Sequence, residues 1–434
     1  MSANLPIDLL IAGAGPVGLE AALAAAEAGL EFCLVEAGDR AGANVRSWGH
    51  VRMFSSWELN VSARMRAALA RGGVEVPEGG ANPTGDELAA RLLDPLARLP
   101  AVATRLRLGH RVVAIGKSGL HKAAEIGTPR RAAQPFRALV DTPGGEAVWH
   151  ARAVLDCTGN YEVPLWLGDG GVPAPGERAQ GSRIVRRLPD FAADPERWCG
   201  RTVLLAGAGH SAQTAATALA TLAARATTGG RIPPRVIWAL RRAHPQILDQ
   251  LLPAGDPLPE RGALHVRAIA LIEGRHPAVE ARLGATVESM AAAPEPSHQV
   301  LVRLRRGDAD GFEEIAADEV LALVGTCGDR ALYAELHVHE CYATCGPIKL
   351  AAKLLGEGNA DCLAQASGDA EELVNPEPGF FVLGSKSYGR NSAFLMRVGY
   401  EQVASVMPHL IQHLSRQRSV PVPPAGDAAE ANDG

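Results

Sequence analysis

The chain contains two stretches in which an apolar run ends in glycine and is followed by an alanine-rich segment and a second apolar run. An uninterrupted apolar run is typical of a strand buried on both faces of a parallel sheet, and the alanine-rich segments have the composition of helices. The predicted strand, helix and strand are residues 8–13, 16–29 and 31–36 in the first stretch, and residues 202–207, 210–225 and 235–240 in the second. The pattern therefore predicts an α/β protein with two β-α-β units.

Three further apolar runs end in glycine, at residues 153–159, 319–325 and 379–384. Strands of this kind commonly close a nucleotide-binding segment, so the first two mark crossing points between domains. The third precedes a polar stretch and a helix predicted from about residue 393 to 412. We therefore expect boundaries near residues 160 and 325, with the last part of the chain returning to the first domain.

The first β-α-β unit carries a dinucleotide-binding loop. Gly13, Gly15 and Gly18 have the G-x-G-x-x-G spacing, and Pro16 opens the predicted helix. The first glycine allows a tight turn, the second lets the backbone approach a pyrophosphate, and the third lets helix and strand pack closely. Glu36 ends the next strand, where its carboxylate can accept hydrogen bonds from ribose hydroxyls. This context predicts an FAD site, whereas a bare strand-turn-helix is the alternative interpretation.

The second unit repeats the loop with a small residue in place of the third glycine. Gly207, Gly209 and Ala212 keep the spacing, and His210 and Ser211 lie between the second and third positions. Alanine suits the third position because only a small side chain is needed there for helix packing. The sequence thus predicts a second dinucleotide site.

Arginines replace the acid that should end the next strand. Arg241 and Arg242 follow the predicted strand directly. A guanidinium pair suits a ribose 2′-phosphate through charge-assisted hydrogen bonds, which favours NADPH over NADH. The alternative is that the two arginines only solvate an exposed strand end.

These motifs together resemble those of the flavin-containing monooxygenase and thioredoxin-reductase-like flavoproteins. The resemblance rests on the first loop with Glu36, on the closing Asp156-Cys-Thr-Gly159, on the second loop with Arg241, and on the terminal strand that ends at Gly384. It covers nearly the whole chain. It implies that Gly159 and Gly384 also contact the cofactor.

The resemblance implies two Rossmann-like domains, with the NADPH domain inserted into a discontinuous FAD domain. The FAD domain would comprise residues 1–160 and 326–418, and the NAD(P)H domain residues 161–325. The flavin ring would lie between the domains, and the last helix, beginning near residues 392–394, would point its N-terminus at the ring. One stretch departs from the family pattern, because residues 180–190 lack the F-x-G-x-x-x-H motif that usually precedes the second loop in flavin monooxygenases.

Two polar stretches are candidates for the chemistry. His50 and Arg52 lie in an aromatic stretch after the second predicted strand, where they could steer nicotinamide or substrate. The alternative is a loop that packs two layers together. Lys386 and Asn391 follow the last predicted strand and could hydrogen-bond the flavin or a peroxide, whereas the alternative is a polar turn.

Cys341 and Cys345 suggest a dithiol that could exchange electrons with a flavin. Three residues separate them, and related disulfide reductases use other spacings in other places. If residues 342–355 are helical, bridging is geometrically possible but not favoured, and two buried thiols are the alternative. His337 and His339 have no third ligand nearby, so we predict no metal site.

Composition and charge restrict the partners. The formal net charge is −5 and the chain has no long basic run, which argues against nucleic acid as a partner. No apolar run reaches the roughly 20 residues that a membrane span needs. Seven scattered cysteines and no leader-like N-terminus fit a reducing, cytoplasmic location. The tail, residues 419–434, is rich in proline, alanine and acids, and we expect it to be disordered. The sequence leaves the oligomeric state open.

The sequence therefore favours an enzyme in which NADPH reduces FAD and the reduced flavin activates molecular oxygen for insertion into a small-molecule substrate. Two alternatives stay open. One is an NADPH-dependent disulfide or quinone reductase that uses Cys341 and Cys345. The other is a redox-sensing protein that binds FAD without catalysing turnover.

Overall fold

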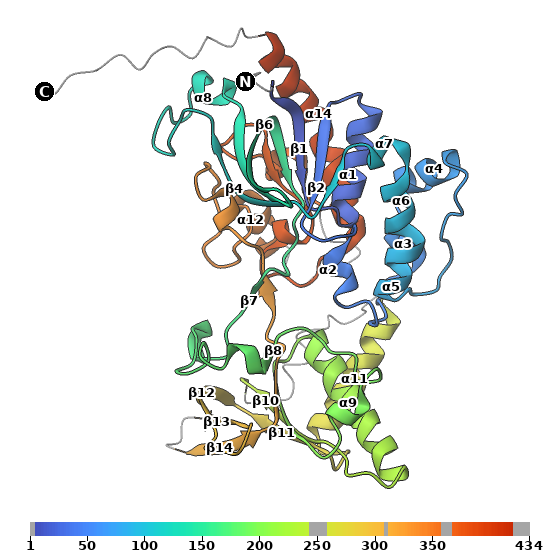
Figure 1. The fold of residues 1–434 in the computed structure, drawn as a ribbon, viewed down its shortest axis with the longest axis vertical. Coiled ribbons are helices and arrows are strands. Elements are labelled where there is room, and N and C mark those ends of the chain that lie inside the picture. The colour runs from blue at the N-terminus through green and yellow to red at the C-terminus, as the bar shows by residue number, and fades with distance from the viewer. Residues whose placement is uncertain (1–4, 243–257, 308–310, 357–366, 420–434) are drawn as a thin grey trace, which may run out of the picture.

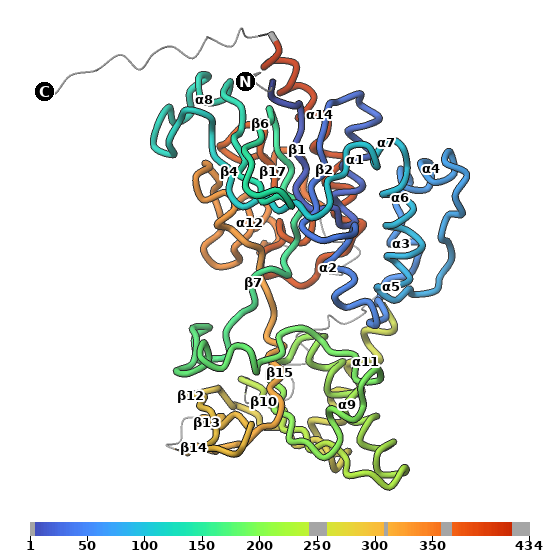
Figure 2. Tube along the Cα trace, viewed as in Figure 1, coloured from blue at the N-terminus to red at the C-terminus, as the bar shows by residue number. Residues whose placement is uncertain are grey.

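The chain forms two lobes joined by a narrow link (Figure 1). The computed structural model describes residues 5–242, 258–307, 311–356 and 367–419. The link pairs β7 (Val163–Pro164) with β16 (Thr326–Cys327) in antiparallel orientation. We call residues 5–162 and 328–419 the first lobe and residues 165–325 the second lobe. Figure 2 shows that the chain crosses between the lobes at this link in both directions.

The first lobe is built on a seven-stranded sheet. Its central strand, β1, lies between β2 and β6 and runs parallel to both, so that Ala12 pairs with Val35 on one side and with Asp156 on the other. The last strand pairs in parallel with β6, which brings distant parts of the chain into one sheet. The strands are β1 (Ile7–Ala12), β2 (Phe32–Glu36), β3 (Leu106–Leu108), β4 (Arg111–Lys117), β5 (Phe136–Thr142), β6 (Gly145–Asp156) and β17 (Phe380–Val382).

The helices of the first lobe share one core. Alanines on α1 let it pack closely against both the sheet and α14, and Leu19, Val403 and Leu410 are fully buried there. The helices are α1 (Pro16–Glu27), α2 (Ala43–Arg46), α3 (Trp57–Asn60), α4 (Ala63–Arg71), α5 (Gly85–Leu88), α6 (Asp94–Arg98), α7 (Pro100–Ala103), α8 (Pro129–Ala133), α12 (Ile348–Gly356), α13 (Ala370–Leu373) and α14 (Met396–Ser419).

The second lobe has a five-stranded parallel sheet in the order β11-β10-β9-β15-β8, with a three-stranded antiparallel sheet beside it. Leu219, Val236 and Trp238 belong to the core between the parallel sheet and its helices. The elements are β8 (Ile184–Val185), β9 (Thr202–Ala206), α9 (His210–Thr228), β10 (Arg235–Leu240), α11 (Pro259–Ile272), β11 (Val279–Leu283), β12 (Ala285–Ala292), β13 (Val300–Arg306), β14 (Phe312–Ala317) and β15 (Glu319–Ala322).

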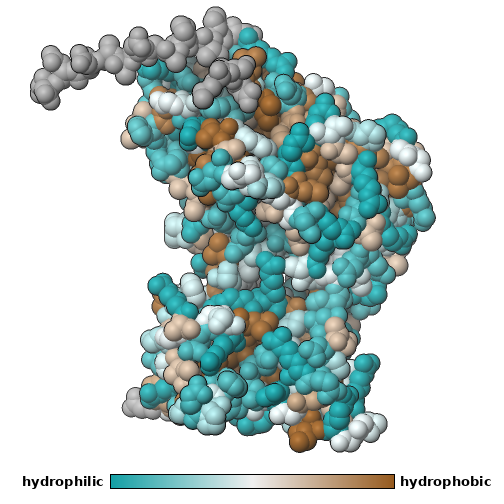
Figure 3. Space-filling model, viewed as in Figure 1, coloured by the Kyte–Doolittle hydropathy of each residue, from teal (hydrophilic) through white to brown (hydrophobic). Residues whose placement is uncertain are grey.

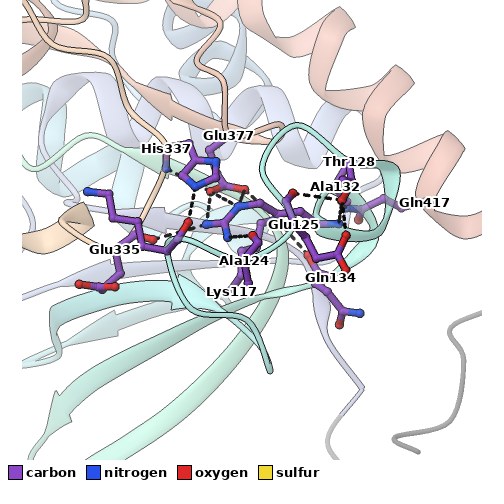
Figure 4. A network of polar contacts seen from close by, with 12 residues as sticks. Lys117, Ala124, Glu125, Thr128, Ala132, Gln134, Glu335, His337, Glu377 and Gln417 are labelled. Carbon is purple, nitrogen blue, oxygen red and sulfur yellow. Dashed lines mark hydrogen bonds and ion pairs between the residues drawn. The ribbon is translucent and has the colours of Figure 1, made fainter. Parts of the chain in front are cut away.

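A buried ionic network ties the two parts of the first lobe together (Figure 4). Glu377 is fully buried and accepts hydrogen bonds from Arg131 Nη2 at 2.7 Å and from the His337 amide at 3.2 Å. Lys117 Nζ lies 3.9 Å from Glu377 Oε1 and donates to the Gln134 carbonyl at 2.9 Å. Since Lys117 and Arg131 come from the first part of the chain and Glu377 from the last, the network joins residues that are far apart in sequence.

The predicted α/β fold class with two Rossmann-like units is confirmed. The predicted helix at residues 393–412 is shifted, because α14 begins at Met396 and continues through Ser419, one residue into the predicted tail. The rest of that tail, residues 420–434, lies outside the described residues, as does Cys362. In the part of the chain that the structure describes, no helix is both long enough and apolar enough to cross a bilayer.

Candidate functional site

The two lobes enclose a cleft of about 1500 Å³. Figure 3 shows the surface indented between them. The volume exceeds the roughly 300–1,000 Å³ of ordinary small-molecule pockets, so the cleft has room for more than one ligand. Most of the residues predicted from the sequence line it: Gly13, Gly15, Pro16, Glu36, Arg52, Gly159, Gly207, Gly209, His210, Ser211, Arg241, Arg242, Gly384 and Asn391.

The first glycine loop joins β1 to α1 at the wall of the cleft. Gly13 has a φ of +96°, and a Cβ built on it would lie 2.6 Å from the Cys157 carbonyl oxygen. A Cβ on Gly18 would lie 1.8 Å from the Gly13 carbonyl oxygen, so a side chain there would push α1 off the strand. A Cβ on Gly15 would meet nothing within 4 Å. Only Gly15 therefore leaves its backbone open toward the cleft.

The start of α1 can hold an anion. Its N-cap is Gly15, which supplies no side-chain hydrogen bond, and Pro16 is the first helical residue. The first N–H groups of a helix lack partners within the helix, and the helix dipole places positive charge beside them. A pyrophosphate in the cleft would meet both features.

Glu36 lies at the end of β2 beside this loop. Its Oε2 accepts from the Ala14 amide at 3.0 Å and its Oε1 accepts from the Gly38 amide at 2.9 Å. Burial raises the pKa of this carboxyl, while the two amide hydrogen bonds oppose that rise. Because Glu36 also lines the cleft, its carboxylate is held in place to receive ribose hydroxyls.

The second loop repeats this geometry between β9 and α9. Gly207 has a φ of +126°, and a Cβ there would lie 2.2 Å from the Leu323 carbonyl oxygen. Gly209 is the N-cap of α9, and a Cβ on it would meet nothing within 4 Å. Ala212 does not line the cleft but is fully buried under the loop, as its predicted packing role requires. In both loops, therefore, the first glycine makes the tight turn, the second leaves its backbone open to the cleft, and the third position packs the helix against the strand.

Arg241 and Arg242 follow β10 directly. Both side chains are exposed and both line the cleft on the side of the second loop. The acid that would repel a 2′-phosphate is absent from this strand end. The position thus combines open cleft surface with two guanidinium groups.

The segment after β17 closes the opposite side of the cleft. Gly384 has a φ of +73°, and its amide donates to Gln402 Oε1 at 2.8 Å. Asn391 Oδ1 accepts from the Ala393 amide at 2.9 Å in the turn before α14. The first residue of α14, Met396, lines the cleft, so this helix begins at the cleft wall.

Lys386 is placed differently from the prediction. Its side chain is buried beneath the cleft, and it is absent from the described lining. Its Nζ lies 2.6 Å from Asp156 Oδ2 and 3.1 Å from Thr158 Oγ1. With its charge engaged in this ion pair, Lys386 supports the cleft wall, and its hydrogen bond to a flavin or a peroxide stays a prediction.

The two candidates in the aromatic stretch, His50 and Arg52, lie in different surroundings. His50 is exposed and is not among the described residues that line the cleft, so its steering role stays a prediction. Arg52 lines the cleft at its exposed edge, where it lies 3.7 Å from Glu87. The aromatic residues of the same stretch, Trp48 and Phe54, line the cleft as well.

The cysteine pair does not lie in a helix. Helix α12 begins only at Ile348, and Cys345 has a φ of +64° in the turn before it. Both Cys341 and Cys345 are free thiols, and neither lines the described part of the cleft. Hydrogen bonds from the side chain and backbone of Thr344 lower the pKa of Cys341.

The histidine pair shows no metal-binding geometry. His337 Nε2 contacts the Lys122 carbonyl oxygen at 2.5 Å. No cluster of three or more metal-ligating side chains occurs among the described residues.

One wall of the cleft was not predicted from the sequence. Residues of the segment 160–188, which leads from the first lobe into the second, line it, among them Tyr161, Trp166 and Arg187. The available signal was weak. Tyr161, one of only five tyrosines in the chain, stands two residues after the predicted cofactor residue Gly159.

Comparison with known proteins identifies the fold. No family model matches the chain, and no curated protein matches its sequence. The bacillithiol disulfide reductase from Bacillus cereus is 18% identical, with a TM-score of 0.66 over 95% of this chain and 100% of that one. The cadaverine monooxygenase of desferrioxamine biosynthesis from Erwinia amylovora, solved with FAD, is 12% identical, with a TM-score of 0.59 over 99% of this chain and 100% of that one.

A third similar structure is the ornithine N-hydroxylase from Kutzneria, solved with reduced FAD, NADP⁺ and L-ornithine. It is 15% identical, with a TM-score of 0.56 over 95% of this chain and 100% of that one. Identities this low establish the fold only. The chain therefore has the fold of flavoproteins with two dinucleotide-binding domains, and both reductases and monooxygenases share it.

Proposed function

We propose that this protein is an FAD- and NADPH-dependent oxidoreductase, and within that class a monooxygenase that acts on a small molecule with molecular oxygen. One observation carries the proposal. Two glycine loops line one cleft from opposite lobes, and in each loop the first glycine is sterically required while the second leaves its backbone open. This arrangement suits one dinucleotide on each lobe, with their reactive ends meeting between them.

The first lobe would hold FAD. Its pyrophosphate would lie against Gly15 and the start of α1, and Glu36 would accept from the ribose. The segment from Gly384 to Met396 would border the ring, with the first turn of α14 directed at the cleft. When bound, the flavin supplies the hydride acceptor and the oxygen chemistry.

The second lobe would hold NADPH. Gly209 would admit the pyrophosphate, and Arg241 and Arg242 would receive the 2′-phosphate. Guanidinium groups bind phosphate oxygens in bidentate fashion and stay charged at all physiological pH values. This placement supports NADPH over NADH.

The thiols favour a monooxygenase over a disulfide reductase. A flavoprotein that reduces a disulfide by thiol–disulfide exchange needs a reactive thiol that can take electrons from the flavin. In the described lining of the cleft, Cys157 is the sole cysteine, and burial raises its pKa far above the usual value, which keeps it protonated. Cys341, whose pKa is lowered, lies away from that lining.

The test is anaerobic stopped-flow reduction of the FAD-loaded protein by NADPH and by NADH, followed by mixing with oxygen. We expect faster reduction by NADPH, slow return of the oxidised flavin spectrum, and delayed release of hydrogen peroxide. Prompt release of one peroxide per flavin would contradict oxygen insertion, and rapid oxidation by a quinone would instead identify a quinone reductase. Flavin that binds but is not reduced would identify a sensing protein.

A further inference from the structure

The segment 160–188 supplies a part of the cleft that neither glycine loop explains. It leaves the end of β6, passes through the link strand β7 and reaches β8. Tyr161 and Arg187, near its two ends, line the cleft together with Trp48 of the first lobe.

Trp48 and Tyr161 form an aromatic surface inside the cleft. Their ring centroids lie 6.5 Å apart and their planes are inclined by 28°, which is a stacked arrangement. Tyr161 is 37% exposed and lines the cleft, so its ring offers surface to a ligand there. A planar apolar group in the cleft would cover that surface.

The same surface carries hydrogen-bond donors. Among the described residues the buried indole Nε1 of Trp48 makes no hydrogen bond of full geometry, although the Tyr161 phenol lies beside it. Desolvation raises the pKa of the Tyr161 phenol, which therefore stays protonated, while the nearby Arg187 guanidinium and the Trp48 indole N–H partly oppose that rise. Arg187 is exposed, and the described residues offer it no carboxylate within 4 Å. A buried donor without an acceptor is costly unless a ligand supplies one.

The fold holds Arg187 at this place. Its neighbour Arg186 donates to the Leu165 carbonyl at 3.0 Å and to Glu177 Oε1 at 2.8 Å. Glu177 is fully buried and also accepts from the amides of Leu167 and Ala174. These bonds hold the backbone next to Arg187, which lies in a bend two residues after the end of β8.

The charge of the cleft favours an anion. Eight arginines and three carboxylates line its described part. The three carboxylates are engaged: Glu36 accepts two amides, Glu162 lies 3.3 Å from Arg111, and Asp329 accepts from the Ala331 amide. A carboxylate is an acceptor-only group and would match the indole N–H, the phenol O–H and the guanidinium together.

We infer that Trp48, Tyr161 and Arg187 form the substrate subsite of the cleft and that it takes small aromatic or conjugated carboxylates. The inference rests on the proposed function, because it gives the substrate class of the same site. The ring of the ligand lies on the Trp48–Tyr161 surface, and its carboxylate accepts from Trp48 Nε1 and Arg187.

The test uses two probes of matched shape, indole-3-carboxylate and indole-3-carboxamide. Their binding to the FAD-loaded protein is measured by calorimetry with NADP⁺ present. We expect the carboxylate to bind about tenfold or more tightly than the amide, since only the carboxylate accepts charge-assisted hydrogen bonds from Arg187. Arg187→Gln should remove that preference, and Tyr161→Leu should weaken both probes.

Arg183→Gln is the matched control, because Arg183 is exposed on the same segment but does not line the cleft. It should leave both affinities unchanged. Equal binding of the two probes to the parent protein would overturn the inference. So would a loss of NADP⁺ affinity in Arg187→Gln without any change for the carboxylate, which would assign Arg187 to the cofactor.

Flavin content and the rate of reduction by NADPH are measured on the same preparations. If the protein fails to bind FAD or to accept electrons from NADPH, the proposed function itself fails. If both are normal and no preference for the carboxylate exists, only the subsite fails. A Trp48→Phe variant that loses FAD rather than the probe would also overturn the subsite, because the indole would then serve the cofactor.

Discussion

Lys386 Nζ lies 2.6 Å from Asp156 Oδ2, and both side chains are almost completely buried. The pair joins the end of β6 to the segment after β17, which are 230 residues apart in the sequence. Thr158 Oγ1 donates to Asp156 Oδ1 at 2.7 Å and accepts from Lys386. Since Thr158 lines the cleft, this ion pair supports the cleft wall from below.

Replacing Lys386 with methionine should destabilise the protein by about 3–5 kcal/mol, because Asp156 would keep a buried charge without a counter-ion. Urea denaturation measures the free energy of unfolding. The double variant K386M/D156N should recover a large part of the loss, since it removes the remaining charge. A loss below about 1 kcal/mol in K386M would mean that the pair is not the support that its burial indicates.

Substitutions at Gly15 and at Gly209, the two open glycines, should each impair the binding of a different cofactor. Gly15→Val should fold normally, because a Cβ there meets no protein atom within 4 Å, but FAD affinity should fall by about tenfold or more as the pyrophosphate is blocked. Gly209→Val should bind FAD normally and lose reduction by NADPH. Flavin absorbance and stopped-flow reduction measure the two effects.

Gly13→Ala serves as the contrast, because its Cβ would collide with the Cys157 carbonyl and should impair folding itself. If Gly15→Val retained full FAD occupancy, the dinucleotide would not approach the first loop. The assignment of FAD to the first lobe would then be wrong.

The arginine pair should set the preference for NADPH. The double variant R241Q/R242Q should lower kcat/KM for NADPH by about 10- to 100-fold and leave that for NADH nearly unchanged, since only NADPH carries the 2′-phosphate. Arg235→Gln is the control on the same strand, because Arg235 pairs with Glu280 and does not line the cleft. An equal loss for both coenzymes would show that the arginines act on something other than the 2′-phosphate.

Neither thiol of the candidate pair should be needed for turnover. Cys341→Ser and Cys345→Ser should each keep NADPH oxidation within about twofold of the parent, because neither residue lines the described part of the cleft. Steady-state oxidation of NADPH with oxygen and with a disulfide acceptor measures this. Loss of disulfide-dependent turnover in either variant would restore the reductase interpretation.

The buried network around Lys117 should make stability depend on pH. Burial lowers the pKa of Lys117 to about 8, against an ordinary value of 10.5, while Glu377 opposes this decrease and Arg131 adds to it. His413 also lies close enough for Lys117 to lower its pKa. Between pH 8 and 10.5 the unfolded chain therefore binds the additional proton, and the free energy of unfolding rises with pH.

Below pH 8 the protonated lysine imposes its full cost on the folded state. Denaturation at several pH values, with Lys117→Met as the reference, isolates this contribution because the other titrating groups cancel in the difference. The exposed Lys349→Met is the control and should show no rise over the same window. A difference that stays constant from pH 8 to 10.5 would contradict the lowered pKa.

The sequence by itself determined the strand-helix order and the two glycine loops. These features are local: Gly13, Gly15 and Gly18 act on a single turn, and short apolar runs and alanine-rich segments mark the strands and helices of the two units. The position of Arg241 and Arg242 could also be predicted from the sequence, because they directly follow the residues that form β10. Local backbone constraints of this kind survive any arrangement of the rest of the chain.

Only the tertiary structure decided which side chains meet. Lys386 is buried against Asp156. His50, Cys341 and Cys345 are absent from the described lining of the cleft. Tyr161 and Arg187 line the cleft together with Trp48. These outcomes depend on contacts between segments far apart in sequence, where packing and desolvation decide whether a charge is buried, paired or open to a ligand. Residue spacing along the chain carries no record of those distances.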